Sequence, residues 1–268
     1  MGVRINSNIP ALKANREARN ANNLVETSLR RLSGGLRIDR AADDAAGLAI
    51  ADRFNALARQ SQVEIGNLQS GVSAAQVADG GLSGQQDVAQ RLRELAVQAS
   101  NGTLSDADRA AINTEARQLI EQIGDIGEGT EFNGAQLLNG STPVINVGAG
   151  GVQVTLPEST PASLGINGVD LSTQVGAQAA LGTIDTALNR IDQNRASLGA
   201  QQNRFENAIN QREIQGLNAR DSESRIRDLD IALGVMERTR GQLRQQSGLA
   251  ALAQSNVTPQ SALRLLGG

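Results

Sequence analysis

A seven-residue repeat of apolar side chains between residues 181 and 209 is the feature that most constrains the fold of this chain. One stripe contains Ile184, Ile191, Leu198 and Phe205; the other contains Leu181, Leu188 and Ile209, with Arg195 and Gln202 as polar interruptions. A repeat sustained over four heptads is typical of a coiled coil rather than of a short globular helix. The second half of the chain therefore needs a helical partner of similar length.

Helical periodicity in the first 140 residues offers that partner. Apolar residues at four-, three- and four-residue spacings occur in two sets, Val25, Leu29, Leu32 and Leu36, and Val88, Leu92, Leu95 and Ala99. Such spacing puts each set on one face of a helix. We expect the N- and C-terminal halves to lie alongside each other as a mainly α fold, a long antiparallel helical bundle or coiled coil.

Capping residues predict where two of these helices begin. Asp43 and Asp44 precede a stretch that we expect to be helical to about Ser100, and Ser105 follows the break at Asn101 and Gly102. Short polar side chains accept hydrogen bonds from the free N–H groups of a first helical turn, and carboxylates there favour the helix dipole. We therefore interpret Asp43 with Asp44 as caps, and likewise Ser105 with the acidic residues that follow it.

The segment from 141 to 177 differs in composition, with prolines, glycines and hydroxyl residues. Two short apolar runs flank the glycine-rich stretch at 148–151, namely Val144, Ile145 and Val147, and Val152, Val154 and Leu156. This arrangement predicts a β-hairpin at the tip of the bundle, the only β signal that we find in the sequence. We expect Ser141, Thr142 and Ser159 to be solvated loop residues.

Composition supports helix packing and excludes several functions. The chain has no Cys, His, Trp or Tyr and only three Phe, so its apolar residues are mainly Ala, Leu, Ile and Val, which suit close helix-on-helix contacts. The net charge of −3 lacks the basic excess that nucleic-acid binding requires. We find no membrane span and no signal-peptide pattern, so we expect no membrane insertion and, if the protein is exported, a route without a cleavable signal.

The residue inventory also argues against catalysis. Without His or Cys there is no imidazole base, thiolate nucleophile or ordinary zinc site. The carboxylate pairs Asp43 with Asp44, and Asp106 with Asp108, stand at predicted helix starts. We therefore interpret them as helix caps rather than as catalytic carboxylates. The glycines at 148–151 lack the lysine of a phosphate-binding loop. We expect no enzyme activity, cofactor or metal.

Several long motifs, in the expected order, resemble the two conserved ends of bacterial flagellins. The N-terminal matches are INSNIPALKANREARN (5–20), LRRLSGGLRIDRAADDAAGLAIADRF (29–54), QRLRELAVQASNGT (90–103) and TEFNGAQLLNG (130–140). The C-terminal matches are LGAQQNRFENAIN (198–210), SESRIRDLD (222–230) and QSNVTPQSALRLL (254–266). The resemblance covers nearly everything except the central segment. Some flagellins are O-glycosylated, so the resemblance also makes Ser141, Thr142 and Ser159 of that segment candidate O-glycosylation sites.

This resemblance implies a structural subunit that polymerises into the flagellar filament for swimming motility. It assigns residues 1–42 and 235–268 to filament-core helices, 43–140 and 178–234 to a rod-like helical domain, and 141–177 to a short central β and loop segment. The implied partners are further copies of the chain, an export chaperone, and cap and hook–filament junction proteins, with the filament outside the cell. A junction protein, a non-flagellar coiled-coil adhesin or secretion needle, and an enzyme on a helical scaffold remain as alternatives.

The resemblance also implies two groups of functional residues. The stretch QRLRELAVQ is similar to the segment that Toll-like receptor 5 recognises in flagellins, which points to Gln90, Arg91, Arg93, Glu94 and Leu95. Leu92, Leu95 and Ala99 equally fit a buried stripe, and Arg91 with Glu94 equally fit a surface ion pair. For assembly and packing we expect the apolar residues of both ends to be used: Leu29, Leu32, Leu36, Leu188, Ile191, Leu198, Phe205, Leu263 and Leu266.

Overall fold

The computed structural model describes residues 8–147 and 152–266, with side chains up to Val257, and it separates into two compact units. Unit 1 contains Met1–Ala58 and Leu217–Gly268, and unit 2 contains Arg59–Gly216. The boundaries fall inside the helices α2 (Ala45–Ala99) and α5 (Gln174–Arg227). The predicted glycine turn at 148–151 lies outside the described residues.

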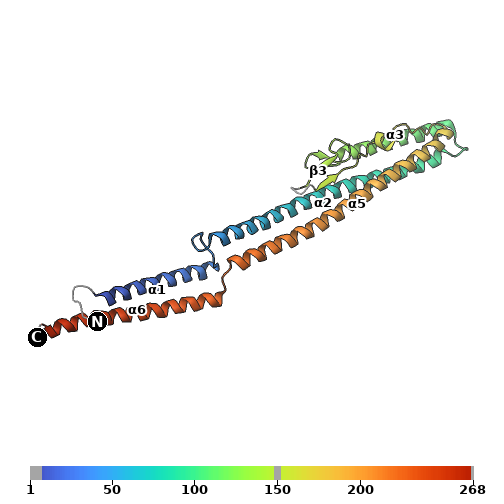
Figure 1. Ribbon diagram of the computed structural model, residues 1–268. Helices are drawn as coiled ribbons and strands as arrows, with labels where there is room; N and C mark the ends of the chain where they lie inside the picture. The colour runs from blue at the N-terminus through green and yellow to red at the C-terminus, as the bar shows by residue number, and fades with distance from the viewer. Residues whose placement is uncertain (1–7, 148–151, 267–268) are drawn as a thin grey trace. The chain divides into compact units, whose positions relative to one another are not determined.

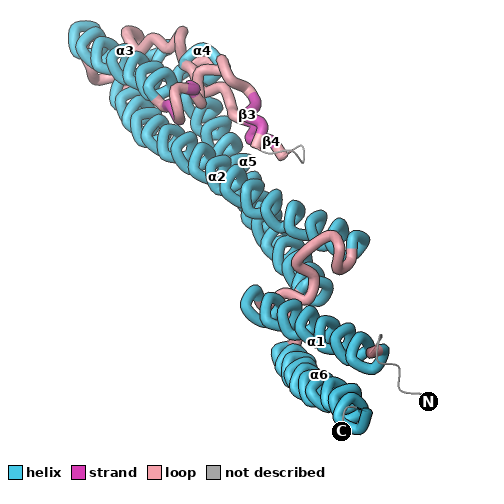
Figure 2. The backbone as a smooth tube through the Cα atoms, turned by 90° about the vertical axis from the view of Figure 1, so that its left-hand side faces the viewer, coloured by secondary structure: helices cyan, strands magenta, loops and turns pink. Residues whose placement is uncertain are grey.

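Unit 2 is built on α2 and α5, which lie side by side in both views (Figures 1 and 2). The helix α3 (Asp106–Gly129) folds back along α2, and a short α4 (Pro161–Leu164) precedes α5. The prediction of a mainly helical fold made from paired N- and C-terminal regions is thereby confirmed.

The heptad pattern of unit 2 is buried on both helices. The buried positions of α5 that recur every seven residues are Ala177, Ile184, Ile191, Leu198 and Phe205; those of α2 are Leu68, Ala75, Leu82, Ala89 and Ala96. Leu181, Leu188 and Ile209, the other predicted stripe, are half-buried against the same core. Large side chains on α5 thus combine with many small ones on α2, and close packing replaces aromatic bulk.

Polar pairs beside this core fix the register of α2 against α5. Arg93 donates to Asp185 at 2.6 Å, Gln86 donates to Asp192 at 2.9 Å, and Arg195 donates to Asp79 at 2.9 Å. Asp79, Gln86 and Arg93 of α2 are seven residues apart. The pairs therefore recur along one edge of the α2–α5 contact, as e and g pairs do in coiled coils. Arg195, a polar interruption in the sequence repeat, is therefore one of these edge residues.

The helix caps differ in part from the prediction. Ser105 accepts from Asp108 N–H while the Asp108 carboxylate accepts from Ser105 N–H, which forms a capping box at the start of α3. Asp44 accepts from Gly47 N–H in the first turn of α2 at 2.9 Å. Asp43 does not cap this helix, because its carboxylate turns back to accept from the N–H groups of Asp39 and Arg40. It stabilises the preceding loop instead.

The described residues form two small antiparallel sheets, one more than the sequence predicted. The predicted hairpin is confirmed as β3 (Val144–Asn146) paired with β4 (Gln153–Thr155). The second sheet pairs β1 (Glu131–Phe132) with β2 (Ala135–Gln136). Asn133 and Gly134 connect these strands with φ values of 51° and 77°, as a two-residue type I′ turn requires. The Asn-Gly signal was visible in the sequence, but the strands are too short to show alternation.

The hairpin lies along the side of α2 and α5 rather than at the tip where it was expected. Val147 contacts α2 beside Gly71, where an added Cβ would come within 2.9 Å of a Val147 methyl. On α5, the Gln201 amide accepts from Thr155 N–H at 2.7 Å and donates to Thr155 C=O at 3.0 Å, as a neighbouring strand would. The physical reason is that α3 returns the chain along α2 before the hairpin begins.

Unit 1 consists chiefly of α1 (Ile9–Gly34) packed against α6 (Ile231–Leu266). An antiparallel bridge between Leu36 and Asp228 joins the segments that follow α1 and precede α6. Hydrogen bonds from Arg37 N–H to Arg227 C=O and from Leu229 N–H to Gly35 C=O extend this bridge. Gly35, at φ 67°, ends α1 in the left-handed region that favours glycine.

Candidate assembly surface and recognition segment

The fully buried side chains of unit 1 are mainly small. Besides Gly234 and Gly241, the buried residues of this unit, among those described, are Ala18, Ala21, Ser28, Ile38, Ala51, Ala58 and Ala219. Only Ile38 is a large aliphatic residue, and it lies in the loop between α1 and α2. Alanine and serine allow helices to approach closely, but they remove little apolar area from water. The pairing of α1 with α6 within one chain is therefore weakly driven.

Many large apolar side chains of α1 and α6 are exposed instead. Exposed examples on these two helices are Ile9, Leu12, Leu29, Ile231, Leu233, Val235, Met236, Leu243, Leu249 and Val257. Exposed large apolar residues in this number are typical of an interaction surface or an aggregation hazard. We call these ten residues the outer apolar set.

The predicted assembly residues are divided between the two units. Leu29 is 45% exposed and belongs to the outer apolar set, whereas Leu32 and Leu36 are half-buried. The side chains of the predicted residues Leu263 and Leu266 lie outside the described residues. In unit 2, Leu188 is half-buried, and Ile191, Leu198 and Phe205 belong to the core. A role of these residues between subunits stays a prediction.

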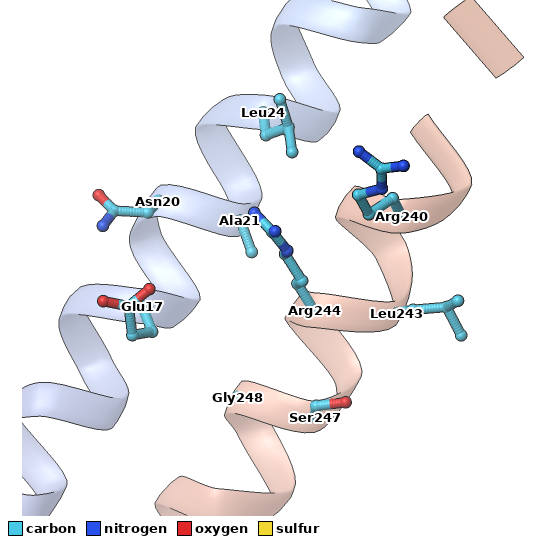
Figure 3. A pocket seen from close by; sticks show the side chains of 9 residues that line it. All are labelled: Glu17, Asn20, Ala21, Leu24, Arg240, Leu243, Arg244, Ser247 and Gly248. Atoms are coloured by element: carbon cyan, nitrogen blue, oxygen red, sulfur yellow. The ribbon is translucent and has the colours of Figure 1, made fainter. Parts of the chain in front are cut away.

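A shallow groove of about 480 Å³ runs between α1 and α6. Figure 3 shows Arg244 reaching from α6 towards Ala21 of α1, while Leu243 points away from α1. Glu17 and Asn20 line the α1 side of the groove, so its lining is mixed in charge and polarity. The apolar character of this unit lies on its outer faces rather than in the groove.

The predicted recognition segment forms an exposed row on α2. Gln90, Arg91, Arg93 and Glu94 are exposed, whereas Leu95 is only 2% exposed and packs in the core of unit 2. Any partner that approaches this face in the folded chain meets the four polar residues.

Ion pairs hold the charged side chains of this row in place. Arg91 donates to Glu94 at 3.0 Å and to Glu115 of α3 at 3.1 Å. The Glu94 hydrogen bond first, and then that of Glu115, raises the pKa of the Arg91 guanidinium. Arg93 donates to Asp185 of α5. Sequence reasoning missed Glu115 and Asp185, because only the packing of α3 and α5 beside α2 brings them to this face.

Other candidate sites have structural roles or are absent from the part of the chain that the structure describes. Ser159, a proposed O-glycosylation site, is fully buried and donates to Gln85 at 2.6 Å, so that assignment is wrong for the folded chain. The described residues contain no cluster of acidic side chains suited to a metal ion. None of the described helices has a stretch long and apolar enough to cross a membrane.

Comparisons with known proteins give consistent matches along the chain. Residues 5–142 match the family model described as the bacterial flagellin N-terminal helical region, and residues 181–266 match the C-terminal helical region. The chain is 38% identical to a flagellin of Halalkalibacterium halodurans, over 98% of this chain and 99% of that protein. It is also 38% identical to the flagellar filament 33 kDa core protein of Treponema phagedenis, with the same coverage.

A solved structure supports the fold. The putative flagellar hook-associated protein from Vibrio parahaemolyticus is similar with a TM-score of 0.55, covering 69% of this chain and 97% of that one. The sequence identity is 18%, so this match supports only the helical architecture.

Proposed function

Given that the chain belongs to the bacterial flagellin family and is a structural, non-enzymatic core subunit of the flagellar filament, we propose that unit 1 supplies its principal assembly surface. Membership of this family implies self-polymerisation into a filament. The exposed apolar residues of unit 1 make it the candidate for the part of the subunit that drives polymerisation.

The observation that carries this proposal is the outer apolar set. Leu12 is 65% exposed and Leu243 is 60% exposed, although both belong to helices that already have a partner within the chain. Burial of a large aliphatic side chain contributes about 1.5 to 3 kcal/mol relative to leaving it exposed. All ten residues are at least 45% exposed, so contacts with other copies would add apolar burial that the isolated subunit lacks.

We infer from the same imbalance that folding of the chain ends is coupled to assembly. Ordering a residue costs roughly 1 to 2 kcal/mol in backbone entropy, and small buried side chains repay little of it. An isolated subunit would then leave the regions up to about Leu36 and from about Gly241 largely disordered. Neighbouring subunits would supply the missing burial, as in other cases of coupled folding and binding.

Two truncations test this mechanism. Deletion of residues 1–30 or 241–268 should leave unit 2 folded, with an unchanged cooperative melt, while electron microscopy shows no filaments under conditions in which the full chain polymerises. The full-length protein is the control for both assays. Strong hydrogen-exchange protection of both ends in the monomer, or filaments formed by either truncation, would refute coupled folding.

The finer partnerships follow from the family and remain proposals. An export chaperone would shield the outer apolar set before assembly, and cap and hook–filament junction proteins would occupy the two ends of the growing filament. Each of these partners would meet the same apolar helices that other subunits cover.

A second proposal is that Toll-like receptor 5 recognises the exposed row on α2. Its support is that Arg91, Arg93 and Glu94 are solvent-exposed yet held by ion pairs, so a partner would order few side chains on binding. Arg91→Ala or Glu94→Ala should weaken the response to monomer in a receptor reporter assay, and the filament should be a poorer agonist. Arg204→Ala, which removes another exposed arginine of unit 2, is the matched control. A silent parent monomer would contradict the proposal.

A further inference from the structure

The glycines of α6 are spaced by seven residues and follow a matching repeat on α1. Their positions and those of the α1 residues that approach them are Gly248 with Ala18, Gly241 with Val25, and Gly234 with Leu32. Each step of seven along α6 meets a step of seven in the opposite direction along α1. One antiparallel register therefore brings every glycine of this helix against α1.

The space available for an added Cβ differs among the three glycines. At Gly241 an added Cβ would lie 2.8 Å from Cγ2 of Val25, a separation that real Cβ atoms do not adopt. At Gly234 it would lie 2.9 Å from Cδ2 of Leu229, just before α6, and 3.0 Å from Cδ2 of Leu32. At Gly248 it would lie 3.5 Å from Ala18, which is ordinary van der Waals contact. An added Cβ thus meets the tightest contact at Gly241.

The identity of the facing residue makes the approach at Gly241 difficult to relieve. Valine is β-branched and keeps one strongly preferred rotamer in a helix, so its methyl groups cannot swing aside as a leucine methyl can. Gly241 and Gly234 are buried, and Ala21 and Ser28 are buried on the facing side of α1. Insertion of a methyl group would have to separate the helices or shift their register.

We propose that Gly234, Gly241 and Gly248 form a spacing device that sets the distance and register of α1 against α6, and thereby aims the outer apolar set. This inference rests on the proposed role of unit 1 in assembly. Glycine is also the poorest helix former after proline, so the same residues disfavour α6 as a helix on its own. The glycine heptad makes α6 depend on its partner helix, and it permits a close pairing once that partner is present.

The test compares three glycine-to-alanine variants of the full chain. Gly241→Ala should raise the critical concentration for polymerisation at least tenfold, even though alanine favours helix. Gly248→Ala should change it less than threefold, since its methyl group meets only ordinary contacts. Gly199→Ala is the matched control in a helix of unit 2, where nothing lies within 4 Å of the added Cβ.

A compensating substitution separates close approach from helix propensity. Val25→Ala combined with Gly241→Ala removes the methyl group that clashes, so the double variant should recover most of the assembly lost in Gly241→Ala. Val25→Ala alone is measured alongside, and the melt of unit 2 should be unchanged in every variant. Normal assembly of Gly241→Ala, or a double variant that assembles no better than Gly241→Ala, would overturn the inference. Failure of the parent chain to polymerise would instead contradict the proposed function.

Discussion

The two units of this protein use opposite arrangements of the same few aliphatic residues. In unit 2 the large residues Ile191, Leu198 and Phe205 lie inside and are fully or almost fully buried. In unit 1 alanine and serine lie inside, while leucines such as Leu12 and Leu243 lie outside. The difference indicates that unit 2 is stabilised by its own sequence, whereas the apolar residues of unit 1 are suited to contacts with other chains.

The largest test of this contrast is to remove one large side chain from each unit. Ile191→Ala should destabilise the monomer by about 2 to 5 kcal/mol, because it empties a filled position in the core. Leu243→Ala should change monomer stability by less than about 0.5 kcal/mol, as surface changes usually do, but should weaken polymerisation. Chemical denaturation and a sedimentation assay measure the two effects.

The control for this pair is Gln193→Ala, an exposed change on α5 in unit 2. It should affect neither property. A core substitution that costs no more than this control would remove the case for the heptad register.

A second test concerns the polar part of the core of unit 2. The Gln85 amide is fully buried and donates to the carbonyl groups of Ile123 and Ser159. Gln85→Ala leaves these acceptors and the Ser159 hydroxyl without their partner, so we expect a loss of about 1 to 3 kcal/mol in unfolding free energy.

Gln86→Ala is the neighbouring comparison, because Gln86 lies at the edge of the seam and its partners can turn to solvent. A loss there as large as at Gln85 would show that burial does not explain the effect. Hydrogen exchange of the Ser159 segment provides the local readout.

A smaller effect is expected from the edge pair Arg93 and Asp185. Both side chains are about half exposed, so their bond should contribute no more than about 1 kcal/mol. Reversal of either charge should destabilise unit 2 slightly, and reversal of both should restore it. A double-mutant cycle measured by denaturation at low and high salt checks this, and an absence of coupling at low salt would contradict a role in register.

The smallest effect concerns acid. Hydrogen bonds from the Ser105 hydroxyl, and then from its backbone N–H, lower the pKa of Asp108 below its ordinary value of 3.8. A carboxyl group whose folded pKa is depressed contributes stability above the unfolded pKa, and loses that contribution as pH falls through the folded value. Asp108→Asn should therefore flatten the decline of the melting temperature below about pH 4. Asp125→Asn is the exposed control, and an equal flattening there would contradict the assignment.

Sequence reasoning succeeded where periodicity alone decides the structure. The buried stripe from Ile184 to Phe205, the Ser105 cap and the β3–β4 pairing follow from local spacing and turn residues. It failed where the outcome depended on which helix lies beside which. The burial of Ser159 is set by tertiary packing, which a pattern of residue types does not encode. Asp43 is drawn into its own loop by the nearby N–H groups of Asp39 and Arg40, which compete with the helix start for its carboxylate.

The assembly surface shows the same limit. The sequence identified apolar stripes at both ends of the chain, but the inward direction of the small residues emerges only from the contact of α1 with α6. The glycine heptad of α6 is visible in the sequence once α1 is known to face it. A partner helix separated by most of the chain cannot be aligned from spacing alone.

Because α1 and α6 come from opposite ends of the sequence, we expect them to separate whenever unit 2 unfolds, whereas unit 2 does not unfold when they separate. Once unit 2 melts, their encounter requires closure of a loop of about 150 residues, which costs on the order of 4 kcal/mol and rises only slowly with length. Folded unit 2 acts as a tether that removes most of this cost and raises the effective concentration of each end for the other. Loss of unit 2 therefore separates the ends, whereas separation of the ends leaves unit 2 intact. The two ends of a subunit can therefore separate and pair again many times while unit 2 stays folded.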